Sequence, residues 1–483
     1  MIFASQVFIF CFLPLFFILY YTFGKLFGIK GKNTVLFLMS LIFYAWGEPV
    51  YVLLMIYSSV LDYTCGRCIY SASQSGRKAR AKLFLGISLF GNLALLGCFK
   101  YLGFFTETVN SVLSVSIPVI ELSLPIGISF YTFQTMSYSI DVYRGKIIPQ
   151  RNFIYFGAYV AMFPQLIAGP VVRYADIARE LDDRKETIEG VAAGMRRFVV
   201  GLSKKVLIAN TMAAVVDTLY ESTPAALGVM GTWIAIIAYT FQIYFDFSGY
   251  SDMAIGMGKM MGFNYPENFN YPYIARSITD FWRRWHITMS QFFRDYVYIP
   301  LGGNRCSIIK WLRNIIVVWF LTGLWHGAAW HYAAWGLYFA VILVAEKLFL
   351  NKLLTKSRVI SHVYSVLLIM FGWVIFRCDT LRDALSFFKS MFGFNGLYGN
   401  DTVPAPILLQ RAGVNTVFLV TLVFAIVFSA PVIPWLKNRI KNMSAMKAKY
   451  ILCASDCILV VLLVASSIQL ALGSYNPFIY FEF

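Results

Sequence analysis

The sequence predicts an all-α protein that crosses a membrane many times. The chain has 483 residues, of which 59% are hydrophobic and only 13% are charged, and its mean hydropathy is +0.66. Soluble domains carry about 25% charged residues. Uncharged apolar runs long enough to cross a hydrocarbon core of about 30 Å recur along the whole chain. We therefore expect one polytopic membrane domain over residues 1–483, without a soluble domain.

Basic residues give the chain a net charge of +17, and they gather in short segments between the apolar runs. By the positive-inside rule, such segments lie in the cytoplasm. Nucleic-acid binding needs a basic soluble surface, so we expect membrane lipids and no nucleic acid among the partners. The basic segments cover residues 25–32, 77–82, 144–151, 196–205, 305–313, 347–358 and 437–449.

The apolar runs are interpreted as membrane helices in chain order. Residues 5–23 form the first, because the N-terminus lacks the basic start and cleavage motif of a signal peptide. Residues 33–46 and 50–70 flank a Gly47-Glu48-Pro49 break and form a hairpin. With the basic segments placed in the cytoplasm, both termini are expected to lie outside. Further spans are expected at residues 83–99, 124–142, 206–219, 232–247, 359–376, 414–430 and 451–472.

Two apolar segments do not fit a simple crossing, because basic segments lie at both ends of each. Residues 153–170 are interrupted by prolines and glycine and are expected to be re-entrant. Residues 315–345 contain no Asp, Glu, Lys or Arg and would make a helix about 46 Å long, more than the bilayer needs. Gly323 and Gly327 bracket Trp325-His326, so we predict two helical pieces that meet near His326. Irregular backbone at that depth is tolerated where it is buried in protein or lines a cavity.

The segment 277–296 has a different pattern, with aromatic and aliphatic residues at helical spacing on one face. Arg283 and Arg294 lie on another face, and Ser277 with Asp280 resembles a capping box. We predict an interfacial amphipathic helix. His286 would lie on its apolar side, one turn from Trp282.

His326 is the first candidate for a catalytic residue, because an ionisable side chain in a membrane-length apolar run marks a functional site by default. A neutral imidazole suits a general base that takes a proton from an acceptor hydroxyl. The alternative is a hydrogen-bonded packing residue. For His286 two interpretations stay open: it supports catalysis, or it is a partly solvated histidine at the membrane interface. We interpret His331 as structural, because five residues separate it from His326 on a helix.

Several polar residues are candidates for substrate binding. Asp246 and Asp252, at the end of a membrane segment, could position a substrate, orient a histidine or satisfy backbone groups at a helix break. Arg283 and Arg294, with Arg284 and Arg305, could attract the phosphates of an acyl donor or bind anionic lipid headgroups. The eight cysteines include a single C-x-x-C pair and no completed metal motif, so no metal site is expected.

Long motifs of this chain resemble the membrane-bound O-acyltransferase (MBOAT) family, and within it the alginate O-acetyltransferase subgroup. The resemblance extends over nearly the whole chain and is densest over residues 124–338. The motifs are PIGISFYTFQTMSYSIDVYRG, FPQLIAGPVVRY, YFDFSGYSDMAIG, ENFNYPY, DFWRRWHITMSQFFRDYVYIPLGGN and LTGLWHGAAWHYAAWG.

The resemblance implies a helical bundle with re-entrant and interfacial helices around a central reaction tunnel. It matches the family's active histidine to His326 and its second motif histidine to His286, while Trp325 would either line the tunnel or pack. It implies a cytoplasmic thioester donor, acetyl-CoA in our reading, and an extracytoplasmic polysaccharide acceptor. A separate SGNH-type partner, the bacterial cytoplasmic membrane as location and the absence of a bound cofactor are also expected.

Besides a purely structural partner of a polysaccharide synthase, two alternative functions stay open at this point. The first is transfer of D-alanine or another acyl group from a carrier protein to a cell-wall polymer. The second is a proton-coupled transporter in which His326, Asp246 and Asp252 relay protons. A transporter would be favoured by inverted repeats, and the sequence contains no such repeat that we can recognise.

Overall fold

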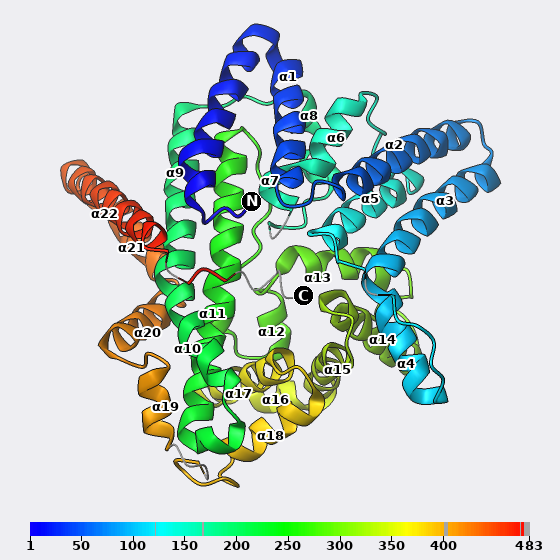
Figure 1. The fold of residues 1–483 in the computed structure, drawn as a ribbon. Coiled ribbons are helices and arrows are strands. Elements are labelled where there is room, and N and C mark those ends of the chain that lie inside the picture. The colour runs from blue at the N-terminus through cyan, green and yellow to red at the C-terminus, as the bar shows by residue number, and fades with distance from the viewer. Residues whose placement is uncertain (121, 167–168, 400–403, 474, 478–483) are drawn as a thin grey trace. The chain divides into compact units, whose positions relative to one another are not determined.

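The computed structural model describes the chain except for residues 121, 167–168, 400–403, 474 and 478–483. Within the described residues, every regular element is a helix (Figure 1). Nine of these helices are long and apolar enough to cross a membrane, and one bent pair could add a tenth. The prediction of an all-α, multi-pass membrane protein is therefore confirmed.

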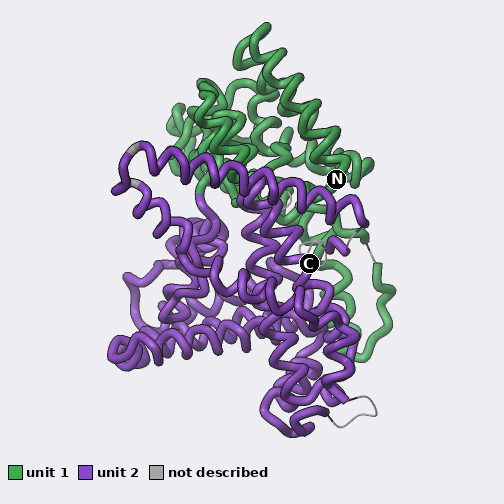
Figure 2. The backbone as a smooth tube through the Cα atoms, turned by 90° about the vertical axis from the view of Figure 1, so that its left-hand side faces the viewer, with its two compact units in different colours: residues 1–198, 253–266 green, residues 199–252, 267–483 purple. Residues whose placement is uncertain are grey.

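The chain folds into two compact units (Figure 2). Unit 1 comprises Met1–Phe198 and Met253–Pro266, and unit 2 comprises Val199–Asp252 and Glu267–Phe483. The expectation of one domain over residues 1–483 stays a prediction.

Unit 1 is built mainly from the N-terminal helices, and several of their bounds differ from the predicted ones. Its helices are η1 (Val7–Phe12), α1 (Leu13–Ala45), α2 (Val52–Gln74), α3 (Lys78–Leu96), η2 (Gly97–Tyr101), α4 (Leu102–Leu113), α5 (Ile128–Tyr143), α6 (Phe153–Ala161), α7 (Phe163–Leu166), α8 (Tyr174–Asp182) and α9 (Ile188–Ser203, which ends in unit 2). Inside it, α2 packs against α3 and α5, and α1 packs against α6.

The basic segment 25–32 lies within α1 rather than in a loop between two spans. The helix changes direction at Gly28, whose φ of 61° is in the left-handed region, which glycine adopts without steric cost. The expected span 124–142 is replaced by the shorter α5, which is almost completely buried. Its apolar residues therefore face protein instead of lipid. The nine-residue α6 is about 14 Å long, too short to cross a bilayer.

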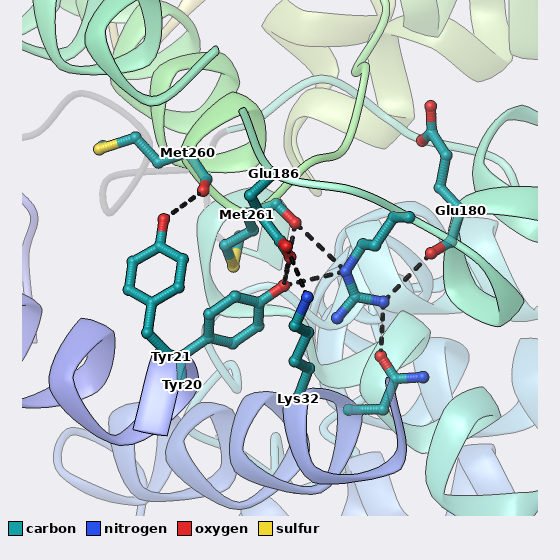
Figure 3. A network of polar contacts seen from close by, with 9 residues as sticks. Tyr20, Tyr21, Lys32, Glu180, Glu186, Met260 and Met261 are labelled. Carbon is teal, nitrogen blue, oxygen red and sulfur yellow. Dashed lines mark hydrogen bonds and ion pairs between the residues drawn. The ribbon is translucent and has the colours of Figure 1, made fainter. Parts of the chain in front are cut away.

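A polar network ties α1 of unit 1 to the loop after α8 and to the end of α11 (Figure 3). The buried Arg184 donates from Nε to the Tyr20 hydroxyl at 2.9 Å and from Nη1 to Asn33 Oδ1 at 2.7 Å. The Tyr20 hydroxyl lies 2.8 Å from a Glu186 carboxylate oxygen, and Lys32 forms an ion pair with the same carboxylate at 2.5 Å. Carboxylate, ammonium and guanidinium groups thus share one set of hydrogen bonds.

Unit 2 contains most of the remaining helices. They are η3 (Lys204–Ala209), α10 (Asn210–Glu221), α11 (Pro224–Met260, which ends in unit 1), η4 (Pro272–Ile274), α12 (Ile278–Trp282), α13 (Ile287–Phe293), η5 (Arg294–Tyr298), α14 (Ile308–His326), α15 (Trp330–Ala345), η6 (Glu346–Leu350), α16 (Asn351–Leu354), α17 (Arg358–Arg377), α18 (Leu381–Met391), α19 (Ala405–Arg411), α20 (Thr416–Phe428), α21 (Val432–Lys441) and α22 (Ala445–Ala471).

Two predicted elements of this part of the chain need correction. The basic segment 196–205 is not a loop, because Ile188–Glu221 is one continuous helical run of 34 residues. The amphipathic segment 277–296 is not one helix, because it divides into α12, α13 and η5. The first break falls at His286, which has a left-handed backbone conformation.

The uncharged stretch 315–345 forms two helices, α14 and α15, as predicted. They pack directly against each other. A Cβ atom on Gly323 would lie 2.2 Å from the Tyr332 carbonyl oxygen, and one on Gly336 would lie 2.1 Å from the Trp319 carbonyl oxygen. The two backbones therefore approach more closely than any side chain at these glycines would allow. This hairpin places His326 at the break between the helices.

Candidate active site

His326 is the last residue of α14 and has only 6% of its surface exposed. Its ring centroid lies 4.9 Å from that of Trp325, 5.0 Å from Trp335 and 5.4 Å from Phe376. These rings form an apolar environment, which disfavours a standing charge on the imidazole. The carbonyl end of a helix favours a cation, so the end of α14 can stabilise the imidazolium that forms when His326 takes up a proton.

His286 occupies the break between α12 and α13 and is completely buried. Its φ of 44° and ψ of 53° are left-handed, a conformation that few residues other than glycine adopt. Such strained conformations persist where the surrounding structure enforces them and cluster at functional sites. The expectation of a partly solvated interfacial histidine is therefore wrong, because the chain folds over this side chain from every direction.

A hydrogen bond holds the His286 ring on one side. Nδ1 lies 3.1 Å from Oδ1 of Asn268, and Oδ1 also accepts hydrogen bonds from the backbone N–H and the hydroxyl of Thr288. The Phe247 ring packs perpendicular to the His286 ring at a centroid distance of 4.7 Å. Burial lowers the pKa of His286 to about 3, so its imidazole is neutral at physiological pH.

Trp325 connects the two histidines. Its centroid lies 4.9 Å from that of His326 and 5.8 Å from that of His286. All three residues belong to unit 2 and are buried. The structure therefore brings the two predicted catalytic histidines close to Trp325, a candidate substrate-binding residue, although His286 and His326 are 40 residues apart in the sequence.

Sequence reasoning missed Glu346, whose carboxylate binds the start of α12. Its buried carboxylate accepts hydrogen bonds from the backbone N–H groups of Ile278 and Thr279 at 2.6 and 2.9 Å, and from the Thr279 hydroxyl at 2.6 Å. It thereby satisfies the first N–H groups of α12, the helix that leads to His286. The sequence contained one indication of Glu346, because it is the first charged residue after the uncharged stretch 315–345.

Sequence reasoning also missed Asn268. It belongs to the Pro- and Asn-rich segment NYPENFNYPY, whose composition suggested only a turn into the next helix. No local pattern indicates that one of its asparagines reaches a histidine 18 residues later.

Asp246 and Asp252 each form an ion pair with a lysine of η3. Lys205 Nζ lies 2.6 Å from Asp246 Oδ1, and both side chains are almost fully buried. Lys204 Nζ lies 2.7 Å from Asp252 Oδ2 in a partly exposed pair. The consecutive lysines thus neutralise the two carboxylates of α11, a pairing that the sequence did not indicate. Their role in substrate binding stays a prediction.

Three of the four arginines expected to bind the donor are exposed, whereas Arg284 is partly buried and donates to Asp280 Oδ1 at 3.0 Å. Arg283 and Arg305 are exposed, and Arg294 donates to the carboxylate of Asp295 at 2.7 Å. Their position on the surface of unit 2 suits phosphate or lipid headgroups equally, so donor binding stays a prediction. The expected cap of α12 is present, because the Ser277 hydroxyl accepts a hydrogen bond from the N–H of Asp280 at 3.0 Å.

Comparison with known proteins shows which family the chain is similar to. The model of the MBOAT, membrane-bound O-acyltransferase family matches residues 119–378. The "Probable alginate O-acetylase AlgI" of Pseudomonas aeruginosa is 43% identical over 82% of this chain and 75% of its own length, and that of Pseudomonas putida is 38% identical over the full length of both. The "Peptidoglycan O-acetyltransferase" of Helicobacter pylori is 34% identical over 82% of this chain and 81% of its own length.

Proposed function

Because the chain belongs to the membrane-bound O-acyltransferase family and is an acyltransferase, we propose that it transfers an acetyl group from a cytoplasmic thioester to an extracytoplasmic polysaccharide. The observation that carries this proposal is the pair of buried histidines that contact one indole, Trp325, with His326 at the end of α14. The names of the relatives, an alginate O-acetylase and a peptidoglycan O-acetyltransferase, support acetyl as the group and a glycan polymer as the acceptor.

In the proposed reaction, His326 is the general base. Its imidazole takes the proton of an acceptor hydroxyl while the hydroxyl oxygen attacks the thioester carbonyl carbon. The new C–O bond forms, the C–S bond breaks, and the imidazolium returns the proton to the leaving thiolate, so that an ester and a free thiol result. A positioned base of this kind contributes about 10²- to 10⁴-fold to the rate.

The aromatic rings around His326 have a second role in this proposal. They keep bulk water from the imidazole, and exclusion of water suppresses hydrolysis of a reactive acyl donor. The apolar side chains of Trp325, Trp335 and Phe376 thus protect the thioester as well as supporting the histidine.

The proposal also includes a donor, a partner and a location. Acetyl-CoA is the donor, and the exposed arginines Arg283, Arg294 and Arg305 are candidates to attract its phosphates. An extracytoplasmic SGNH-type protein receives the acetyl group or presents the glycan. The membrane is the bacterial cytoplasmic membrane, and the likeness to bacterial relatives supports this location.

The test follows thiol release from acetyl-CoA by the purified protein in nanodiscs, with the partner and a glycan acceptor added. We expect turnover by the wild type and a loss of at least about a hundredfold in His326→Ala. His362→Gln is the matched control, because His362 is exposed and outside the aromatic cluster. If the wild type leaves acetyl-CoA intact under these conditions, the donor assignment is wrong, and a carrier-bound acyl group becomes the next donor to test.

A further inference from the structure

The hydrogen bonds around Asn268 determine which nitrogen of His286 carries the proton. The backbone N–H of Thr288, which can only donate, points to the same side-chain atom of Asn268 as His286 does. That atom must therefore be the carbonyl oxygen and not the amide nitrogen, which would be a second donor. The Thr288 hydroxyl, 2.9 Å away, can donate to the same oxygen.

An acceptor at this position requires His286 Nδ1 to be the donor. The neutral imidazole has one N–H and one lone pair, so a proton on Nδ1 leaves Nε2 with the lone pair. The second hydrogen bond of a histidine commonly selects the tautomer in this way. His286 can therefore accept a hydrogen bond at Nε2 and cannot donate one there.

Nε2 is the part of His286 that the protein leaves available. Within the described part of the chain, no protein group forms a hydrogen bond with this buried atom. The Asn268 amide nitrogen is in the same situation. Buried polar groups of native proteins nearly always have partners, so such exceptions require an explanation. The backbone of His286 is also left-handed, a conformation that only a few per cent of non-glycine residues adopt.

We propose that Asn268 is a positioning residue, which locks His286 in the Nδ1–H tautomer and so makes Nε2 a fixed acceptor for an O–H or N–H group of a bound substrate. The inference rests on the proposed function and assigns separate tasks to the two histidines. His326 exchanges the proton, and His286 orients a substrate without changing its own protonation state. Two sources supply the donor group: a hydroxyl of the acceptor, or an amide N–H in the arm of the thioester donor.

Nitrogen NMR on the whole protein in nanodiscs tests the tautomer directly. The chain has only four histidines, so ¹⁵N-histidine labelling yields few signals, and the difference from His286→Gln assigns the one of interest. We expect a protonated Nδ1 and an unprotonated Nε2 for His286 at neutral pH. The opposite tautomer in the wild type would overturn the proposal. This spectrum needs no acyl donor, so it separates failure of the tautomer assignment from failure of the acetyl-CoA assignment.

Kinetics of two Asn268 variants test the consequence. Asn268→Leu removes the acceptor at similar volume, and we expect at least a tenfold rise in one substrate KM with a smaller change in kcat. A rise confined to the KM of the acceptor identifies its hydroxyl as the ligand of Nε2, and a rise confined to that of the thioester identifies the amide. An unchanged KM for both substrates would contradict the proposal.

Asn268→Asp keeps the acceptor and distinguishes positioning from a merely structural role. The carboxylate holds the Nδ1–H tautomer, so we expect the KM to stay within a few-fold of the wild type near neutral pH. A carboxylate also favours the imidazolium and raises the pKa of His286. Activity should therefore fall on the acid side at a higher pH than in the wild type. If Asp and Leu variants lose the same activity without a shifted pH profile, Asn268 is only structural.

Discussion

The polar network of unit 1 and the histidine site of unit 2 differ in what surrounds their buried polar groups, although within the described residues Arg184 Nη2 of the network also has no hydrogen-bond partner. In the network, Arg184 donates to the Tyr20 hydroxyl and to Asn33 Oδ1, and Lys32 neutralises Glu186. At the site, aromatic rings surround the imidazoles, and His286 Nε2 has no protein partner within the described residues. A network of paired charges stabilises the fold, whereas an available nitrogen can interact with a ligand. Removing a buried polar group should therefore lower stability in the polar network of unit 1 and lower activity at the histidine site of unit 2.

The largest difference between the two regions is expected from His326→Ala. Loss of the general base should lower kcat by about 10²- to 10⁴-fold, while the melting temperature stays close to the wild-type value because no charge network is broken. Thiol release and thermal unfolding are measured on the same nanodisc sample. A small change in kcat would show that another group takes the proton.

The second largest effect is expected from a variant that separates α14 from α15. Gly323→Ala places a methyl group against the Tyr332 carbonyl oxygen, so the helices must separate and His326 must move. A displacement of about 1 Å can cost about a hundredfold in rate. Gly86→Ala is the matched control, because no atom lies within 4 Å of the added carbon there. Equal activity of the two variants would argue that the position of His326 tolerates the shift.

In the polar network of unit 1, a substitution is expected to lower stability and to leave kcat unchanged. Arg184→Met removes the donor shared by Tyr20 and Asn33 and leaves buried acceptors without partners, which should lower the free energy of unfolding by about 3 kcal/mol. The thermal midpoint should fall clearly, while the kcat of the protein that remains folded stays near that of the wild type. A large loss of kcat at an unchanged midpoint would assign the network a role in the reaction.

The smallest effect is expected from Asp252→Asn, which breaks the partly exposed ion pair with Lys204. Pairs of this kind contribute about 0–1 kcal/mol, so stability and kcat should change little. The variant also tests the predicted role of Asp252 in substrate binding. A KM that rises at least tenfold would support that role and would show that the pair with Lys204 is not its only function.

The sequence by itself determined the features that depend on local composition. Apolar runs are costly to expose to water, so hydropathy alone predicted a multi-pass helical protein. Gly323 and Gly327 marked the break in an overlong uncharged stretch, and the cost of an imidazole in that stretch identified His326. The motifs around His286 and His326 then pointed to the acyltransferase family.

The tertiary structure alone decided which distant groups meet. Lys204 and Lys205 were interpreted as part of a cytoplasmic loop, but they lie in a continuous helix and pair with carboxylates more than 40 residues away. Asn268 reaches His286 across 18 residues, and Glu346 reaches the start of α12 across 68. Hydropathy and periodicity describe how each segment partitions between water and lipid. Hydrogen bonds and ion pairs between segments depend on packing, which no local pattern contains.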